Sequence, residues 1–458
     1  MVPRISAAIE TVRLLFETEW PSSAAIYLPH GKPPAPGKLF RNPTLAATYQ
    51  RLLREAEAAS SERDAQIEAA RRVWAEGFVA AAVDRFCRTQ EVMDSSGRRH
   101  RGILTGDDMA RWRASVETPL TLDYHGYTVG KCGPWTQGPL LLEALGLLAG
   151  FDLAAMDPTG ADFVHTVVEC LKLALADREA WYGDPDFVDV PIETLLSPPY
   201  NDARRRLVGD RASLELRPGS PDGRTPRVLA GGHEAAITGA GIGEPTVAGV
   251  GEPTTSRQGV VAGDTCHLDV VDRWGNMVSA TPSGGWLQSS PVIPELGFCL
   301  GTRMQMLWLE EGLPASLEPG KRPRSTLSPS MAFKDGAPCM AFGTPGGDQQ
   351  DQWSALMFLH HVHHRMNLQE AIECPAFHTE HQPSSFYPHA AKPGLVALEG
   401  RFPDATRAAL AERGHRLAVG GPWSEGRLSG CAREETAEGT IIKAAANPRG
   451  MQGYAIGR

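Results

Sequence analysis

The stretch that decides the fold is Asp264-Thr265-Cys266-His267-Leu268-Asp269-Val270-Val271-Asp272. An alternating strand is predicted to begin there, directly after a loose segment rich in Gly, Ala, Thr and Pro. The next residues, 272–276, predict a turn, and 277–281 predict a returning strand, so the unit is a β-hairpin. Thr265 is therefore expected at the first position of a buried strand, behind a flexible leader.

This position suits a threonine that becomes a chain terminus. A threonine hydroxyl is a weak nucleophile until a base removes its proton, and the freed α-amino group of the same residue can be that base. An α-amine has a reference pKa of about 7.7–8.0, so it can accept and return the proton near neutral pH. The alternative is an ordinary strand residue, which spacing alone favours because threonine is common in strands.

The stretch 265–276 resembles the start of the small subunit of the γ-glutamyltransferases. These enzymes are N-terminal nucleophile hydrolases, which cut their own precursor just before the catalytic threonine. The other segments that carry the resemblance, in chain order, are 176–178, 183–187, 321–329, 343–347 and 366–371. The resemblance covers nearly the whole chain, and it implies an α/β fold of the four-layer αββα sandwich type.

The resemblance also divides the chain into two regions of one αββα domain. Residues 1–264 are the large-subunit-like region, which ends in a flexible Gly-rich leader, and 265–458 are the small-subunit-like catalytic region. Self-cleavage is expected between Asp264 and Thr265. The usual N-terminal portion of the large subunit, with its substrate-binding arginine, has no counterpart here. Either this lineage is shorter, or the sequence is a fragment that starts at an internal methionine.

The resemblance implies a role for each part of an amide-hydrolysing site. Thr265 is the nucleophile and, through its amine, the base. Gly346 and Gly347 supply backbone N–H groups to the oxyanion, because glycine lets the main chain approach closely. Ser283 occupies the position of a second threonine that hydrogen-bonds the nucleophile. Without the resemblance, the two glycines would be interpreted as a plain turn.

The predicted acyl pocket departs from the family pattern. Ser325 and Thr326 match a serine pair that binds the α-carboxylate of the substrate, but the three positions that bind its α-amino group become Gly285, Arg303 and Met306. An arginine repels an ammonium group and suits a carboxylate. A surface salt bridge of Arg303 is an equally weighted alternative. The resemblance therefore implies the reaction class more strongly than it implies γ-glutamyl specificity. The alternative is a non-γ-glutamyl or catalytically inactive member of the family.

The run His360-His361-Val362-His363-His364 raises the question of a metal site. His360 and His364 are one helical turn apart and can share a face. No acidic third ligand accompanies them in an HExxH-like frame, so a polar helix surface is the favoured interpretation. The same interpretation is favoured for His378–His381. We therefore expect no metal and no organic cofactor, with a metal-dependent hydrolase as the weakest alternative.

Composition limits the partners of the chain. It has 458 residues, a net charge of −9 and no concentrated basic stripe, which argues against a nucleic-acid partner. No apolar run of about 18–20 residues predicts a membrane helix. Eight scattered cysteines without a CxxC pair predict reduced, mostly buried thiols.

A small amide or peptide substrate and the cleaved subunit are the expected partners, and a homodimer is left open. The start lacks an export signal, so a cytoplasmic location is expected, with an exported longer form as the alternative.

Overall fold

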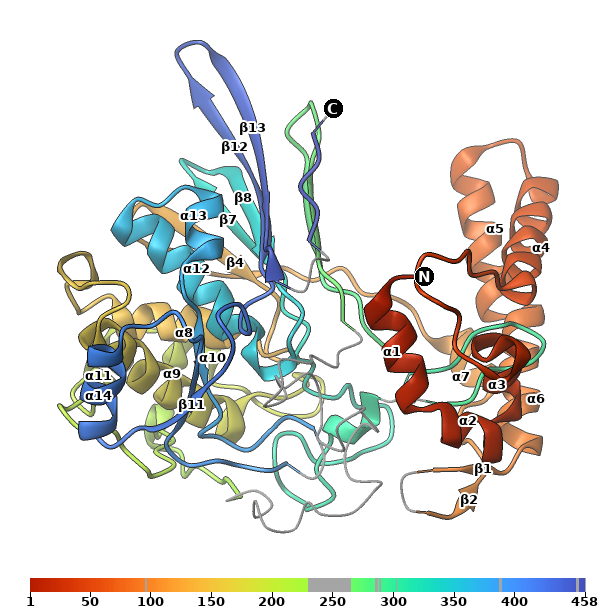
Figure 1. Cartoon of the computed structure of the whole chain (residues 1–458), viewed down its shortest axis with the longest axis horizontal. Coiled ribbons are helices and arrows are strands. Elements are labelled where there is room, and N and C mark those ends of the chain that lie inside the picture. Colours follow the sequence, from red (N-terminus) through yellow and green to blue (C-terminus); the bar gives the residue numbers. More distant parts are fainter. Residues whose placement is uncertain are drawn as a thin grey trace. The chain divides into compact units, whose positions relative to one another are not determined.

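The computed structural model describes residues 1–94, 97–229, 265–284, 287, 290–301, 303–386, 389–449 and 453–457. The predicted leader, Asp264 and Gly285 lie outside the described residues. The described residues form two compact units (Figure 1). One comprises Met1–Val116 and Gly284–Thr302, and the other comprises the described parts of Glu117–Thr238, Gly251–Ser283 and Arg303–Arg458.

The first unit is mainly helical. Asn42 caps α4 by accepting from the Leu45 amide, and Thr105 forms a capping box with Asp108 at the start of α7. Two helices, α1 and α2, meet at Val12, which leaves helical geometry at φ −103° and ψ 6°. The elements of this unit are α1 Pro3–Thr11, α2 Arg13–Thr18, α3 Pro21–Tyr27, α4 Pro43–Ala59, α5 Arg63–Ala75, α6 Phe78–Thr89, β1 Val92–Met93, β2 Arg99–His100 and α7 Gly106–Arg111.

The second unit is built on a six-stranded antiparallel sheet with the strand order β13-β12-β8-β7-β4-β3. Two of its turns have paired left-handed residues, His125-Gly126 and Asp335-Gly336, which is the geometry that two-residue hairpins favour. The strands are β3 Leu120–Tyr124, β4 Tyr127–Lys131, β7 Ser330–Lys334, β8 Ala337–Gly343, β12 Ser429–Thr436 and β13 Gly439–Ala446.

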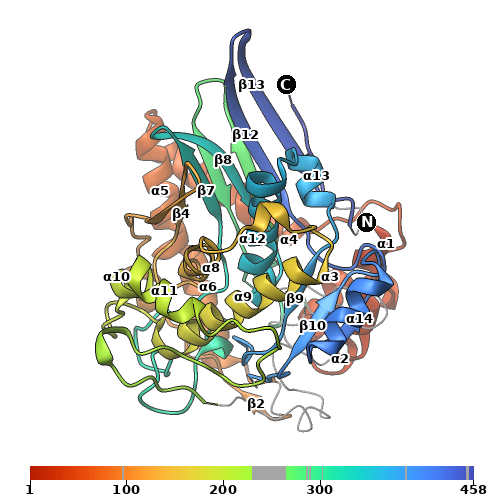
Figure 2. The same ribbon diagram turned by 90° about the vertical axis from the view of Figure 1, so that its left-hand side faces the viewer.

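Helices cover one face of this sheet. The helices α8 Pro139–Leu148, α9 Ala161–Trp181 and α12 Gln350–His364 lie together on that side (Figure 2). They form one apolar core with Val129, Ala332 and Phe342 of the strands. Gly430 on β12 approaches Met357 of α12 so closely that an added Cβ would lie 3.3 Å from its methyl group.

The hairpin of β5 Leu268–Val271 and β6 Met277–Ala280 packs on the opposite face, against β8 and β12. The His267 ring lies against Gly343 at the end of β8, and Ser429 of β12 donates to Asp269 at 3.1 Å. The predicted hairpin is therefore confirmed. The expectation that Thr265 begins a buried strand is wrong, because β5 starts at Leu268 and its outward side chains stay open. Leu268 is 44% exposed, for example. The layers run from helices to large sheet to small sheet.

A second, three-stranded sheet with the order β11-β10-β9 completes the second unit. Strands β10 and β11 are parallel and are connected through α14, which makes a βαβ unit. The remaining elements are α10 Ile192–Leu195, α11 Pro198–Arg205, α13 Leu368–Glu373, β9 Phe377–Thr379, β10 Leu395–Leu398, α14 Asp404–Glu412 and β11 Arg416–Val419.

Neither a membrane-spanning helix nor a disulfide is found in the described part of the chain. Within it, no helix combines the length and the apolarity that crossing a bilayer requires. The cysteines form no disulfide there; Cys87, Cys170 and Cys431 are buried, and Cys266 is exposed.

Candidate active site

The hydroxyl groups of Thr265 and Ser283 meet at the open end of the β5–β6 hairpin. Oγ1 of Thr265 donates to Oγ of Ser283 at 3.0 Å, and both residues are half-buried. Backbone pairing continues past the strands, since the amide of Cys266 donates to the carbonyl of Pro282 at 3.2 Å. This pairing fixes the register that places Thr265 opposite Ser283.

Arg303 adjoins these two hydroxyls. It begins a short 3-10 helix, Arg303–Met306, and its Nη2 donates to Oγ of Ser283. Its guanidinium carbon lies 5.8 Å from the ring centroid of Phe386. Met306, another pocket position that the resemblance marked, is buried at the end of the same short helix. The structure therefore places the Arg303 cation in a hydrogen bond with Ser283, which itself contacts Thr265.

The glycine loop follows β8 directly, so it starts beside the hairpin. Gly346 has a φ of 141° and Gly347 a φ of 53°, which are conformations that side chains disfavour. A Cβ on Gly346 would lie 2.6 Å from the Trp353 ring. Because His267 contacts Gly343, the segment that carries Thr265 and the segment that leads into the loop run side by side.

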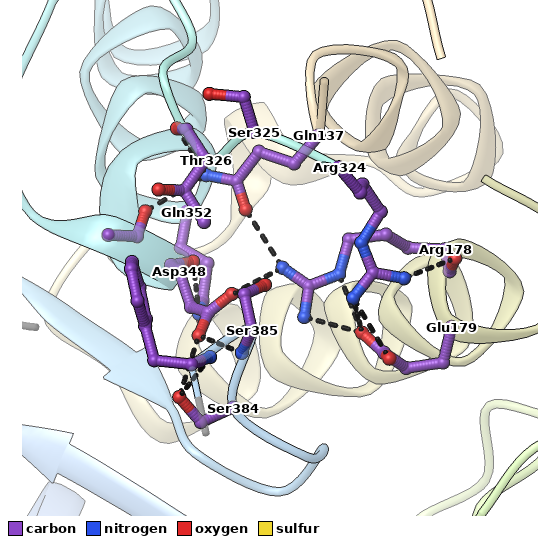
Figure 3. Close-up of polar contacts among 12 residues, drawn as sticks. Gln137, Arg178, Glu179, Arg324, Ser325, Thr326, Asp348, Gln352, Ser384 and Ser385 are labelled. Carbon is purple, nitrogen blue, oxygen red and sulfur yellow. Dashed lines mark hydrogen bonds and ion pairs between the residues drawn. The ribbon is translucent and has the colours of Figure 1, made fainter. Parts of the chain in front are cut away.

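Ser325 and Thr326 join the glycine loop through Gln137. Nε2 of Gln137 donates to the Thr326 carbonyl at 3.1 Å (Figure 3) and to the Gly347 carbonyl at 2.9 Å. The backbones also pair, since the Gln137 amide donates to the Ser325 carbonyl at 2.7 Å. Thr326 is buried and Ser325 is half-buried. The sequence analysis did not single out Gln137.

Two arginines and two carboxylates form a largely buried network that contacts Gln137 and the end of the glycine loop (Figure 3). Arg178 pairs with Glu179 at 2.7 Å and with Asp348 at 2.6 Å, and Arg324 pairs with Glu179 at 2.8 Å. Burial opposes the ionisation of Asp348, but the Arg178 charge and hydrogen bonds from Ser385 lower its pKa. Each of the two arginines therefore has a carboxylate partner.

The histidines of α12 are largely packing residues. His360 is buried rather than on a polar helix surface, and burial with the nearby His364 lowers its pKa to about 3. His361 contacts the Met366 carbonyl at 2.8 Å, and His363 contacts the Tyr124 hydroxyl at 2.8 Å. The predicted exposed surface is thus wrong at His360, because α12 packs that side against Phe163.

Among the described residues, His165, Glu169 and His415 form the group with metal-like spacing, and the sequence analysis did not single it out. Both Glu169 oxygens already hold cations, Lys172 at 2.6 Å and Arg217 at 3.0 Å. His165 and His415 contact each other at 2.8 Å between ring nitrogens. Because both Glu169 oxygens are already paired with side-chain cations, this group is better described as a hydrogen-bonded cluster than as a cation site.

His378 stands behind the glycine loop. Its ring packs edge-on against Trp353, which itself contacts Gly346. Burial disfavours a charge on His378, but contacts with Glu380 at 3.3 Å and Glu425 at 3.1 Å outweigh it and raise the pKa of His378 to about 9. The imidazolium is therefore a structural cation near the loop.

Comparison with known proteins shows the family of the chain. The sequence profile of the gamma-glutamyltranspeptidase family matches residues 1–457. Structures of LmbA2991 align with 55% identity and a TM-score of 0.89, over 100% of this chain and 75% of that one. The acylase ACY 1 proenzyme of Pseudomonas sp. (strain SE83) is 29% identical over 93% of this chain and 63% of the relative. The oxamate amidohydrolase proenzyme of Klebsiella pneumoniae is 29% identical over 88% of this chain and 63% of the relative. The chain thus spans about 63% of the length of these two proenzymes. It belongs to the γ-glutamyltranspeptidase family.

Proposed function

We propose that the protein is an amide hydrolase or acyltransferase that works through an acyl ester of Thr265. The observation that carries the proposal is the 3.0 Å hydrogen bond between Thr265 and Ser283 beside the end of β8. Related proenzymes are named acylase and amidohydrolase, which supports the same reaction class. The protein is made as a precursor, and it cleaves itself between Asp264 and Thr265.

Self-cleavage and catalysis use the same hydroxyl. In the precursor, Oγ1 of Thr265 loses its proton and bonds to the carbonyl carbon of Asp264; as the C–N bond breaks, the Thr265 nitrogen takes up a proton and becomes a free α-amine, and Asp264 is held as an ester on Oγ1. Water then hydrolyses that ester, which leaves a carboxylate on Asp264 and a free hydroxyl on Thr265. This separates residues 1–264 from residues 265–458, which remain together as large and small subunits of one domain.

The mature residue then attacks the substrate amide. The α-amine takes the hydroxyl proton as Oγ1 bonds to the carbonyl carbon, and the N–H groups of Gly346 and Gly347 stabilise the oxyanion. As the C–N bond breaks, the α-ammonium returns the proton to the leaving amine. Water or an acceptor amine then removes the acyl group from Thr265. Ser283 orients the hydroxyl through their hydrogen bond.

The preferred acyl donor is a monoamide of a dicarboxylic acid that carries no ammonium group beside the carboxylate. Arg303 supplies a positive charge next to Ser283, and Met306 cannot bind an ammonium ion. Ser325 and Thr326 supply the remaining contacts to the carboxylate. Oxamate, which the Klebsiella relative hydrolyses according to its name, is itself a carboxylate with an amide and no ammonium group.

The complete assembly is a four-layer αββα sandwich. The order of helices, large sheet and small sheet in the second unit supports three of these layers. A homodimer and a cytoplasmic location stay predictions from the sequence.

The test is hydrolysis by the purified protein of a panel of amides that includes glutaryl, oxalyl and γ-glutamyl donors. Release of amine that is lost in Thr265→Ala supports the reaction class. Release that persists in a folded Thr265→Ala protein contradicts it, and a chelator that abolishes the activity favours a metal-dependent hydrolase instead.

A further inference from the structure

Gln137 connects two parts of the candidate site that lie far apart in the sequence. Its side-chain nitrogen reaches the carbonyl of Thr326 in the acyl pocket and the carbonyl of Gly347 in the glycine loop. A carboxamide NH2 carries two hydrogens, so both bonds can form at the same time. The side chain is fully buried, which removes water as a substitute partner.

Arg178 determines which way this carboxamide faces. Its Nη1 lies 2.8 Å from Oε1 of Gln137. A guanidinium can only donate, so the carboxamide oxygen must face Arg178 and the NH2 must face the two carbonyls. The same Nη1 donates at 2.6 Å to Asp348, the residue directly after Gly347. Arg178 thus binds both Asp348, at the end of the glycine loop, and Gln137, whose side chain contacts the loop.

We propose that Gln137 and Arg178 are positioning residues that fix the two glycines as an oxyanion site and couple that site to the acyl pocket. The proposal rests on the function proposed above. The carbonyl of Gly346 accepts from the Gln349 amide at 3.0 Å, and the carbonyl of Gly347 accepts from Gln137. The first bond orients the peptide that carries the Gly347 N–H, and the second anchors the next peptide, so Gly347 is held between two fixed peptide groups. Donors stabilise a developing oxyanion only when they are preorganised, so loss of the bridge lowers turnover.

The surrounding charges hold this arrangement in place. Arg178 is held by Glu179, which also binds Arg324, and Nη1 of Arg324 donates to the Arg178 carbonyl at 2.9 Å. Ser385 donates to Asp348 through its hydroxyl at 2.5 Å and its amide at 2.8 Å. Each cation therefore has a carboxylate partner, and Gln137 is the neutral link from this network to the two backbone segments.

Two substitutions of similar size separate positioning from general loosening. Gln137→Met removes both donors at every pH. Gln137→Glu places a carboxylate oxygen against two carbonyl oxygens, and only its protonated form regains one donor. At neutral pH we expect kcat for amide hydrolysis to fall at least about tenfold in both variants, since misplaced oxyanion donors cost up to about 10²–10³. The kcat of Gln137→Glu relative to the unaltered protein should rise at least about threefold as the pH falls from about 8 to about 5, towards the range where carboxyl groups bind protons. Gln137→Met should show no such recovery.

Gln369→Met is the matched control, because Gln369 also donates to a backbone carbonyl, that of Ala446 at 3.0 Å, away from the site. Its kcat should stay within about twofold of the kcat of the unaltered protein, as expected for a substitution outside the site. Hydrogen exchange of the amides of 346–349 gives a readout that needs no activity, and it should become at least about tenfold faster in Gln137→Met and stay unchanged in Gln369→Met.

The outcomes distinguish the two proposals. If the unaltered protein hydrolyses amides and a folded Gln137→Met protein retains its kcat within about threefold, the positioning role is wrong while the proposed reaction stands. Loss of kcat in Gln137→Glu without recovery at low pH also contradicts it. If the unaltered protein has no hydrolase activity, the proposed function fails, and exchange at 346–349 that is unchanged in Gln137→Met overturns the positioning role independently.

Discussion

The side-chain oxygens of Thr265 and Ser283 lie 3.0 Å apart although 18 positions separate them in the sequence. The hairpin makes this possible, because its register continues from β5 and β6 to the residues before and after them. Ser283 also accepts from Arg303, so one hydroxyl links the expected nucleophile to a cation. The predictions below test the consequences of this arrangement.

We expect the full-length chain to be found as two fragments, 1–264 and 265–458. The reason is that Thr265 has a hydrogen-bonded hydroxyl at the point where the sequence predicts a cleavable leader to end. Intact-mass spectrometry should find a fragment that begins at Thr265. Thr265→Ala should remain uncut, and Thr265→Ser, which keeps a hydroxyl, should still be cut.

Ser283→Ala provides the matched comparison. Removing one hydrogen bond of about 0.5–1.5 kcal/mol should slow cleavage roughly 2- to 13-fold without abolishing it. Cleavage of Thr265→Ala at the same bond would show that another residue, or a contaminating protease, cuts the chain.

The glycine loop should not tolerate a side chain. Gly347 has a φ of 53°, so Gly347→Ala is strained, and Gly347→Val is strained more because its side chain is branched. We expect kcat to fall by about 10²–10³ in a folded Gly347→Val protein, since oxyanion donors move. Steady-state kinetics with circular dichroism as a fold check measures this.

Gly336→Ala is the control for backbone strain. Gly336 has a φ of 77° in the β7–β8 turn, and an added Cβ meets nothing within 4 Å. It should lose some stability and retain kcat. If Gly347→Val retains kcat as well, the loop does not form the oxyanion site.

Much of the fold could be predicted because the signals are local. The alternating residues on either side of the 272–276 turn predicted the β5–β6 hairpin, which the structure confirms. The positions of Thr265, Ser283 and the two glycines came from the resemblance. The Gln137 bridge could not be predicted, because a side-chain bond to a backbone carbonyl leaves no residue pattern at the carbonyl. Its partners are 189 and 210 positions away.

Alkaline pH should destabilise the protein through His378. Its folded pKa is raised to about 9 from an ordinary value of 6.5, so its charge contributes stability fully below about pH 6.5, and that contribution is lost as the pH rises through about 9. The contribution is on the order of 3 kcal/mol. The urea midpoint of the unaltered protein should fall between pH 6 and pH 9.5.

His378→Gln isolates this effect from other titrations. The variant should be less stable at pH 6, and its urea midpoint should change less over the same interval. Burial opposes the ionisation of Glu380, but the hydrogen bond and charge of His378 lower its pKa to about 2, so its contribution is present above about pH 4.5 and is lost only as the pH falls through about 2. Parallel pH curves for the two proteins would mean that His378 is neutral in the fold.

The last prediction concerns the charge that the acyl pocket selects. Arg303 donates to Ser283, and its guanidinium faces the side of the site where Phe386 lies. A guanidinium about 4 Å from an ammonium group costs on the order of 4 kcal/mol at an effective dielectric constant of about 20. A carboxylate at the same place gains a charge-assisted hydrogen bond of about 1.5–3 kcal/mol. We therefore expect a higher kcat/KM for a glutaryl amide than for the γ-glutamyl amide with the same leaving group.

The two donors differ only in the α-amino group, so their ratio of kcat/KM reports the pocket alone. Arg303→Gln should lower kcat/KM for the glutaryl donor and bring the ratio towards one, because the cation that separates the donors is gone. Arg303→Lys keeps the charge and should retain the preference, although it loses the planar fork that binds a carboxylate with two bonds. A preference that survives unchanged in Arg303→Gln would assign selectivity to Ser325 and Thr326 instead. Equal or better hydrolysis of the γ-glutamyl donor by the unaltered protein would show that the Arg303 charge does not reach the acyl group.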